Sequence, residues 1–355
     1  MRLQLTVLLL LVGPGALAQQ PVRTVLKVNY YADNDGNDVI TPLTSVEGDI
    51  GSVVTVRAHA ALDIMTCASV DVVSAASPKG YFQETRQEYE GGATVKLGPT
   101  TLSGTATWSR ENDYHSFSGG LGFSAELFQK NTTLTLGYGY TGSVVGRSGD
   151  PNFEKDLTSH TITASVSQVL GRRLLGQVGW FVSLLGGFQE SPYRMAELSD
   201  GTFTPESAPD DRTRQSVVLR LRGALSPTWF LGGDYRFYFD TWGIDAHTVQ
   251  VALENEASSW FEWRLRTRIY RQSPADFYAD VYDAMHEFMT ADRELGGLWS
   301  ALVGVKLDFR VPGLGEALDL AFDLKSDLTY QAFDDFRQLP ERWMVVTEAG
   351  VHIDF

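Results

Sequence analysis

The stretch Trp343–Phe355 constrains the fold more than any other part of the chain, because its side chains alternate in character. Counting back from Phe355, every second residue through Ile353 and Val351 to Trp343 is apolar or, once, a threonine. Of the six residues between them, Asp354, His352 and Glu348 are polar or charged. A period of two indicates a β-strand with one apolar and one polar face. Aromatic residues at both ends of the apolar face are typical of a strand that crosses a membrane between its two interfaces.

The same alternation recurs from Val22 onward and predicts about sixteen strands, an even number like that of bacterial barrels. In one of them Trp229 and Leu231 lie on an apolar face, while Asp234 and Arg236 lie on the opposite face. The expected spans are 22–32, 38–49, 52–65, 82–97, 100–112, 114–128, 132–145, 157–170, 173–188, 212–225, 228–240, 244–256, 259–272, 297–310, 317–331 and 343–355.

A soluble β-sandwich also has alternating strands, but three features favour a membrane barrel. Many of the strands exceed the usual length of about five or six residues. Their apolar faces begin or end in aromatic residues. Short connections also alternate with longer polar ones along nearly the whole chain, apart from short connections near 112–113 and 240–243. The pattern predicts an all-β, single transmembrane antiparallel up-and-down β-barrel with short periplasmic turns, longer external loops and a water-filled lumen.

The first 18 residues have the features of a cleaved secretory signal peptide. Arg2 provides the positive start, Leu3–Val12 the apolar core, and Ala16–Ala18 the small-residue cleavage site. A buried hydrophobic element is the less favoured alternative. No later stretch contains eighteen consecutive apolar residues, which argues against a helical membrane protein. We therefore expect one domain over residues 19–355, located in the cell outer membrane.

Composition excludes several other classes of protein. The single cysteine, Cys67, permits no intramolecular disulfide and no Cys/His zinc site. There are 44 acidic residues and 29 lysines and arginines, so the net charge of −15 argues against a nucleic-acid partner.

Several stretches resemble a bacterial outer-membrane family catalogued as domain of unknown function 3570. They are Tyr30–Asp33, Val39–Pro42, Asp63–Ser77, Ser109–Tyr114 and Asn131–Leu134. The resemblance implies an outer-membrane barrel but supplies no activity, catalytic residue or cofactor. It also implies partners, because members are associated with small lipoproteins and flavin-transfer proteins in extracytoplasmic electron-transfer systems.

The final strand separately resembles the closing strand of outer-membrane barrels, which the barrel-assembly machinery recognises. That resemblance implies an assembly signal at Trp343, Val351, Ile353 and Phe355. It also implies that the apolar face contacts outer-membrane lipid.

Arginines alternate with apolar residues on neighbouring strands and are therefore expected to face the lumen. Acidic residues alternate in the same way on a strand expected further round the barrel. One hypothesis is a transverse electric field that orients permeating solutes; the alternative is a lattice of salt bridges that stiffens the wall. The pore-lining candidates are Arg220, Arg222, Arg236, Arg264, Arg266, Arg268, Asp319, Asp323 and Asp327.

The hydroxyl-rich segment Thr66–Ser77 is predicted to fold into the lumen as a constricting loop. An external loop held by turn hydrogen bonds is the alternative. A cation site is less favoured than such hydrogen bonds, so no metal ligand is assigned. The inward-loop candidates are Asp63, Thr66, Ser69, Asp71 and Ser74.

Apolar residues at near-helical spacing predict a short amphipathic helix over 275–290. A helix packed on the barrel's own rim is favoured over one that caps the pore or docks a partner.

The six histidines are scattered, and none forms a nucleophile–base pair with a serine at a productive spacing, so we expect no enzyme. The predicted function is a porin-like channel for small solutes, without a cofactor. The alternatives are a structural or partner-docking barrel of an electron-transfer system and, third, an outer-membrane enzyme.

Overall fold

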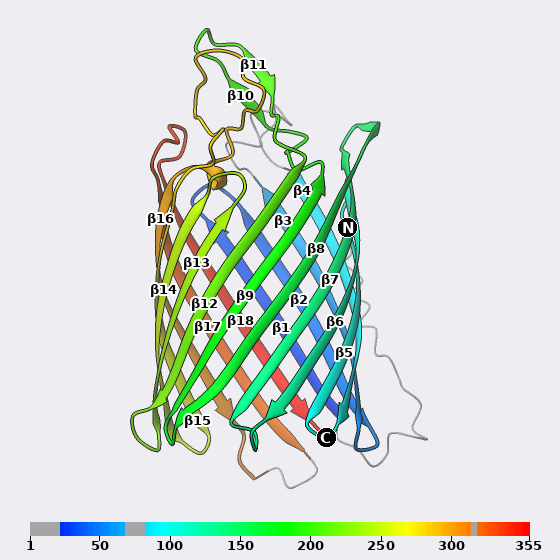
Figure 1. Ribbon diagram of the computed structural model, residues 1–355, viewed down its shortest axis with the longest axis vertical. Helices are drawn as coiled ribbons and strands as arrows, with labels where there is room; N and C mark the ends of the chain where they lie inside the picture. Colours follow the sequence, from blue (N-terminus) through cyan, green and yellow to red (C-terminus); the bar gives the residue numbers. More distant parts are fainter. Residues whose placement is uncertain (1–21, 68–81, 314–317) are drawn as a thin grey trace.

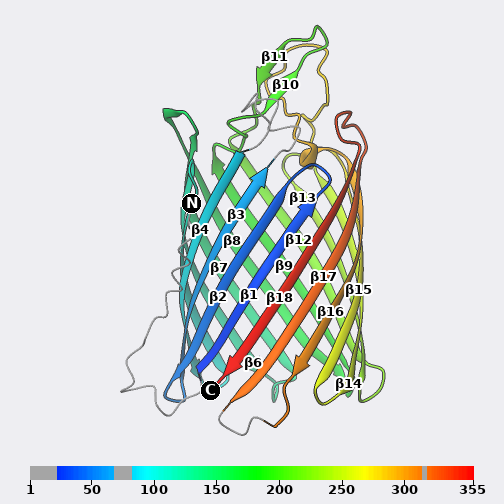
Figure 2. The same cartoon turned by 180° about the vertical axis from the view of Figure 1, so that it is seen from behind.

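A computed structural model describes residues 22–67, 82–313 and 318–355 of the chain. Sixteen antiparallel strands form one closed barrel, in which β1 pairs with β18 and β9 pairs with β12 (Figures 1 and 2). The barrel strands are β1 (Val22–Asp33), β2 (Asp38–Ile50), β3 (Val54–Cys67), β4 (Phe82–Leu97), β5 (Thr100–Arg110), β6 (Tyr114–Leu127), β7 (Thr132–Arg147), β8 (Asp150–Gly171), β9 (Leu174–Gly187), β12 (Asp211–Ala224), β13 (Trp229–Asp240), β14 (Asp245–Ser258), β15 (Phe261–Gln272), β16 (Leu298–Arg310), β17 (Asp319–Phe333) and β18 (Glu341–Asp354).

The barrel confirms the predicted fold class, and each expected span corresponds to one of its strands. The barrel closes at an end that carries short turns, where Val22 N donates to Phe355 O at 2.7 Å, while the opposite end carries the long loops together with short turns such as 111–113 and 148–149. We call the end where the barrel closes the periplasmic end and the opposite one the external end, following the orientation expected from the sequence. At the external end the hairpin of β10 (Met195–Glu197) and β11 (Phe203–Pro205) projects above the barrel rim (Figure 1).

The connection between β7 and β8 differs from the prediction. A long loop is expected over 146–156, but β7 continues to Arg147 and β8 begins at Asp150. Gly149, with φ +83°, allows a tight turn there, and Arg147 pairs with Asp150 at 2.5 Å. The hairpin extends into water above the rim, where both faces of a strand can be polar, so its sequence lacks the apolar alternation by which strands are recognised (Figure 1).

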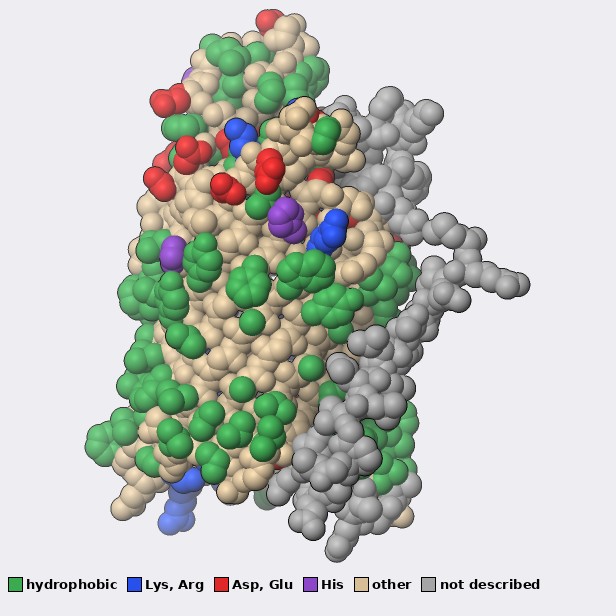
Figure 3. All heavy atoms as spheres, turned by 90° about the vertical axis from the view of Figure 1, so that its right-hand side faces the viewer, with side chains coloured by type: hydrophobic (Ala, Val, Ile, Leu, Met, Phe, Trp, Pro, Cys, Tyr) green, Lys and Arg blue, Asp and Glu red, His purple; other side chains and the backbone are tan. Residues whose placement is uncertain are grey.

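The outer face of the barrel is apolar. Exposed side chains there include Leu121, Val303 and Ile269, at 69%, 57% and 60% exposure. Figure 3 shows hydrophobic side chains in upper and lower bands on the face at the right of Figure 1, with acidic, basic and histidine side chains gathered mainly above the upper band. This distribution fits a barrel whose middle contacts lipid and whose ends contact water.

The predicted helix over 275–290 is wrong. Within the described residues, the only helix is the 3-10 helix η1 (Arg293–Leu295), and none is long and apolar enough to cross a membrane. Leu198 and Ser207 form isolated bridges with Tyr282 and Met289, which are 6% and 2% exposed. The apolar residues of the segment therefore pack on the neighbouring external loop. The Tyr282 hydroxyl favours this coiled path, because backbone N–H groups of the same loop donate to it.

A charge on the outer face should destabilise the barrel, whereas the same charge on the inner face should not. Val303 and Thr329 lie at similar depth on the adjacent strands β16 and β17 but face opposite sides. We expect Val303→Arg to lower the free energy of unfolding by about 2–4 kcal/mol, and Thr329→Arg to change it much less. The free energy of unfolding of both variants is measured by urea titration in lipid, with the folded fraction read from the folded band in gels. Equal losses in the two variants would contradict this assignment of faces.

Candidate functional site in the barrel lumen

The inner wall of β12–β15 carries the arginines predicted from the sequence, and most of them have a carboxylate partner. Arg222 pairs with Asp234 at 3.1 Å, and Arg220 approaches the same carboxylate at 3.6 Å. Arg264 pairs with Glu254 at 2.9 Å. The salt-bridge lattice that the sequence left as one alternative is therefore present on this wall.

One of these pairs reaches across an intervening strand. Arg266 on β15 pairs with Asp327 on β17 at 2.5 Å, and both residues lie opposite Gly304 of β16. A β-carbon on Gly304 would overlap the Asp327 carboxylate. The acidic strand β17 lies two strands further round the barrel than β15, in line with the order expected from the sequence, and Gly304 nevertheless lets Arg266 and Asp327 meet over the strand between them.

The same arrangement recurs near the barrel closure. Lys27 on β1 and Asp323 on β17 lie opposite Gly350 of β18, with 3.5 Å between Lys27 Nζ and Asp323 Oδ1. Asp323 is 4% exposed and also contacts His352 at 2.5 Å. We call the Arg266–Asp327 and Lys27–Asp323 pairs glycine-bridged pairs. The third acidic candidate, Asp319, lies exposed at the start of β17.

Three inward arginines differ from the others. Among the described residues, Arg214, Arg236 and Arg268 have no carboxylate within 4.0 Å; Arg268 is hydrogen-bonded to the Gln250 amide oxygen at 2.8 and 3.0 Å. Arg214 and Arg236 line a recess of about 450 Å³ at the external end. Arg214, Arg236 and Arg268 are thus the inward arginines of this wall without a carboxylate partner, and the first two also lack a hydrogen-bond partner among the described residues.

A loop segment at the external mouth forms the other side of that recess. Gln272, facing inward from β15, donates to the carbonyls of Glu294 and Gly296 at 2.9 and 2.7 Å. Arg342 of β18 pairs with Glu294 at 2.6 Å. The segment Asp292–Gly296 therefore lies along one side of the mouth, between β15 and β18, at the level of the rim (Figures 1 and 2).

Two buried ion pairs fix the walls of this mouth. Arg293 Nη2 lies 2.7 Å from Asp35 Oδ2, and the two side chains are 5% and 0% exposed. Arg212 pairs with Asp240, with side chains 5% and 0% exposed, and its guanidinium lies 4.1 Å from the Trp242 ring centroid. Such pairs hold their geometry, because separating them leaves a charge without water or partner.

The predicted inward loop is only partly described. Asp63 lies in the inner wall on β3, where it accepts from Thr41 and pairs with Arg86 at 2.6 Å. Thr66 belongs to the same strand. Ser69, Asp71 and Ser74 lie outside the described residues. In the described part of the chain, Asp292–Gly296 is a loop segment held against the inner wall at the mouth.

Sequence reasoning missed Arg212, Arg214 and the segment Asp292–Gly296. The two arginines alternate with Thr213 and Gln215 instead of apolar residues, so no outward lipid face marks them as inward. A local signal did exist for the segment, since Asp292 caps η1 by accepting from Glu294 N.

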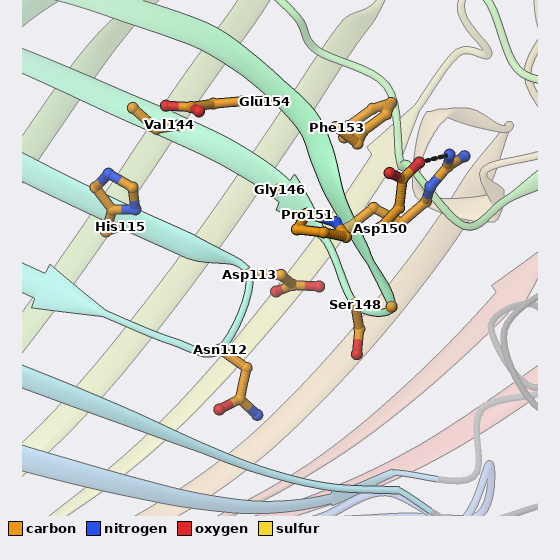
Figure 4. A pocket seen from close by; sticks show the side chains of 12 residues that line it. Asn112, Asp113, His115, Val144, Gly146, Ser148, Asp150, Pro151, Phe153 and Glu154 are labelled. Atoms are coloured by element: carbon orange, nitrogen blue, oxygen red, sulfur yellow. Dashed lines mark hydrogen bonds and ion pairs between the residues drawn. The ribbon is translucent and has the colours of Figure 1, made fainter.

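A second recess, of about 420 Å³, lies at the rim between the β5–β6 turn and the β7–β8 hairpin. Figure 4 shows Asn112 and Asp113 on one side, with Ser148 and Asp150 on the other. Asp113 also belongs to an acidic group with Glu84 and Glu111, and its carboxylate accepts from Tyr193. Burial raises the pKa of Asp113, so it holds its charge less readily than an exposed aspartate.

A closed sixteen-strand barrel with an apolar outer face and a charged lumen defines the class of outer-membrane β-barrels. Several solved structures are similar to this chain at low sequence identity. A bacterial polysaccharide outer membrane secretin is 10% identical over 95% of this chain and 97% of its own, with a TM-score of 0.52. CdiB from Acinetobacter baumannii is 8% identical over 94% of this chain and 60% of its own, with a TM-score of 0.50. OprD from Pseudomonas aeruginosa is 9% identical over 96% of each chain, with a TM-score of 0.46.

Within that class, the chain belongs to the family described as protein of unknown function (DUF3570), whose model matches residues 68–324. The match covers more than half of the chain and confirms the resemblance seen in the sequence. A search of curated proteins gave no match.

Proposed function

We propose that this barrel is a porin-like channel that passes small solutes across the outer membrane. The observation that carries the proposal is the exposure of charged side chains on the inner wall. Arg220, Arg222 and Arg264 keep 46%, 41% and 43% of their side-chain surface accessible. Inside a closed barrel, such side chains are hydrated only if water occupies the lumen, and a hydrated, charged lumen favours the passage of small polar solutes.

Purified protein in a planar lipid bilayer should therefore produce stepwise increases in current. Liposomes that contain it should swell in isotonic solutions of small sugars. The control is the same protein after boiling, and a gel shift between unboiled and boiled samples shows that the barrel is folded. A folded barrel that gives neither current steps nor swelling would refute the channel.

A partner-docking barrel is the second candidate. Phe203 and Met285, in the external loops, are 59% and 64% exposed, so a partner that docks on these loops would cover both side chains. In this proposal the barrel-assembly machinery inserts the protein into outer-membrane lipid. Small lipoproteins or flavin-transfer proteins are its docking partners. A docking barrel without a channel would bind such a partner and conduct no current.

We propose no enzymatic role. His115 and Ser116 are adjacent on β6 and therefore face opposite sides of the wall, so they do not form a nucleophile–base pair. Hydrolysis of a phospholipid or peptide by the purified barrel would overturn this part of the proposal.

A further inference from the structure

The recess at the external end of the lumen has two different walls. The inner faces of β12–β15 form one wall and Asp292–Leu295 forms the other, enclosing about 450 Å³. That volume falls within the range of small-molecule sites, about 300–1,000 Å³. Its apolar lining residues are Trp242, Ile244 and Leu295; the first two lie almost wholly within the wall, at 3% exposure each, and Leu295 is partly exposed.

The acidic residues of the recess are already paired with basic residues. Asp292 pairs with Arg194 at 3.0 Å. Glu294 pairs with Arg342 at 2.6 Å. Neither carboxylate is therefore left to neutralise the opposite wall or to attract a cation.

The basic residues of the recess are not all paired. Arg212 is neutralised by Asp240, but Arg214 and Arg236 have no hydrogen-bond or ion-pair partner among the described residues. Arg214 Nε is also buried without a hydrogen bond, as is the Oε1 atom of Gln189, which lines the same recess. Two positive charges of the recess are therefore uncompensated, and leaving polar atoms buried without partners is costly.

A guanidinium group offers several N–H donors in a planar fork that matches the two oxygens of a carboxylate or phosphate. Thr248, which lies opposite Arg236 on the next strand and lines the recess, adds a hydroxyl group. The lining thus combines two forked cations, a hydroxyl group and an apolar side. This combination suits an organic anion better than a bare cation or a neutral sugar.

We propose that the recess is a binding site for a small organic solute that carries a carboxylate or phosphate group, held by Arg214 and Arg236. The site lies in the lumen and so rests on the proposed channel function: it is the point at which such anions are selected from the external side. Further along the wall the charges of the paired arginines are neutralised by carboxylates, so the anion meets little net charge after it leaves the recess.

The test compares charge-matched variants of the complete barrel. Arg214→Gln/Arg236→Gln removes two charges from the recess, whereas Arg222→Gln/Arg264→Gln removes two inward charges outside it. Arg214→Lys/Arg236→Lys keeps the charge but loses the forks. The gel shift between unboiled and boiled protein confirms folding of each variant. Succinate and inorganic phosphate are the probes, and glucose is the uncharged comparison.

Binding is measured by calorimetry on folded protein in detergent, and block of ionic current by the same probes is measured in bilayers. We expect the Gln recess variant to bind succinate or phosphate about tenfold more weakly or worse, with the Lys variant in between. The matched control should change less than about threefold. We expect no measurable binding of glucose to the wild-type protein or to any of the variants.

Wild-type protein that binds neither probe would overturn the proposal. So would an equal loss in the recess variant and the matched control, because that result shows only a dependence on total charge. Arginine-dependent binding by a barrel that conducts no current would refute the channel and leave the site standing. Failure of the proposed binding site and failure of the proposed channel therefore give different results.

Discussion

Replacing Arg293 with Ala should release the segment Asp292–Gly296 from the mouth of the barrel. The Arg293 guanidinium is buried against Asp35, 2.7 Å away, and lies 5.6 and 5.8 Å from the ring centroids of Phe333 and Phe336. Removing one partner of a buried ion pair costs about 3–5 kcal/mol, because the remaining charge is left without a partner. The pair joins the loop to the β1–β2 turn, so its loss should loosen the loop while the strands stay paired.

The measurement is limited proteolysis by chymotrypsin, which cleaves after aromatic and leucine residues within 273–297. We expect Arg293→Ala to accelerate cleavage there by at least tenfold, since tenfold corresponds to about 1.4 kcal/mol and the expected cost is larger. Arg337→Ala is the matched control. Arg337 pairs with Glu197 and Asp280 in the same external region but is 61% exposed, so the loss should stay within about 1 kcal/mol. Equal cleavage of the two variants would show that the buried pair does not hold the loop.

Gly304→Ala should lower the stability of the whole barrel. A β-carbon there would overlap Asp327 Oδ1 and come within 3.1 Å of Arg266 Nε. The Arg266–Asp327 pair must then separate, and Asp327 is only 4% exposed. The cost should lie near or below the lower end of the range of about 3–5 kcal/mol, because Lys325 remains 3.4 Å from Asp327.

Urea unfolding in lipid, followed by the loss of the fast-migrating band in gels, measures this effect. Gly139→Ala on β7 is the control, because it also faces the lumen but its β-carbon would have no neighbour nearer than 3.9 Å. That variant should unfold close to the wild-type urea concentration. A Gly304→Ala barrel as stable as Gly139→Ala would show that the ion pair adjusts without cost.

The barrel was predictable because its outer face obeys a strict rule. Lipid requires an apolar side chain at every second position, so even short stretches such as Trp229–Phe239 reveal both the strand and its inward side. This alternation is required only where a strand contacts lipid. The β7–β8 hairpin and the segment 275–290 lie in water, and there the prediction of loop and helix failed.

The functional site was less predictable, because it depends on which residues become neighbours across strands. Arg266 and Asp327 are 61 residues apart, and their contact follows from the register of β15, β16 and β17. The sequence also gives no sign that Arg222 is paired while Arg236 is not. That difference arises from the position of Asp234, opposite Arg220 on the next strand.

The glycine-bridged pairs favour one strand register of the folded barrel over its alternatives. Each pair forms only when three consecutive strands meet with the glycine between the two charges. A slip by one residue turns the charges towards lipid, because side chains alternate between faces. A slip of β16 by two residues replaces Gly304 with Leu302 or Lys306, whose side chain then separates Arg266 from Asp327. Gly350 has the same role beside the closing seam, where Lys27 and Asp323 meet only once β1 has paired with β18, so a closed barrel in the wrong register loses charge pairing at two places on its circumference.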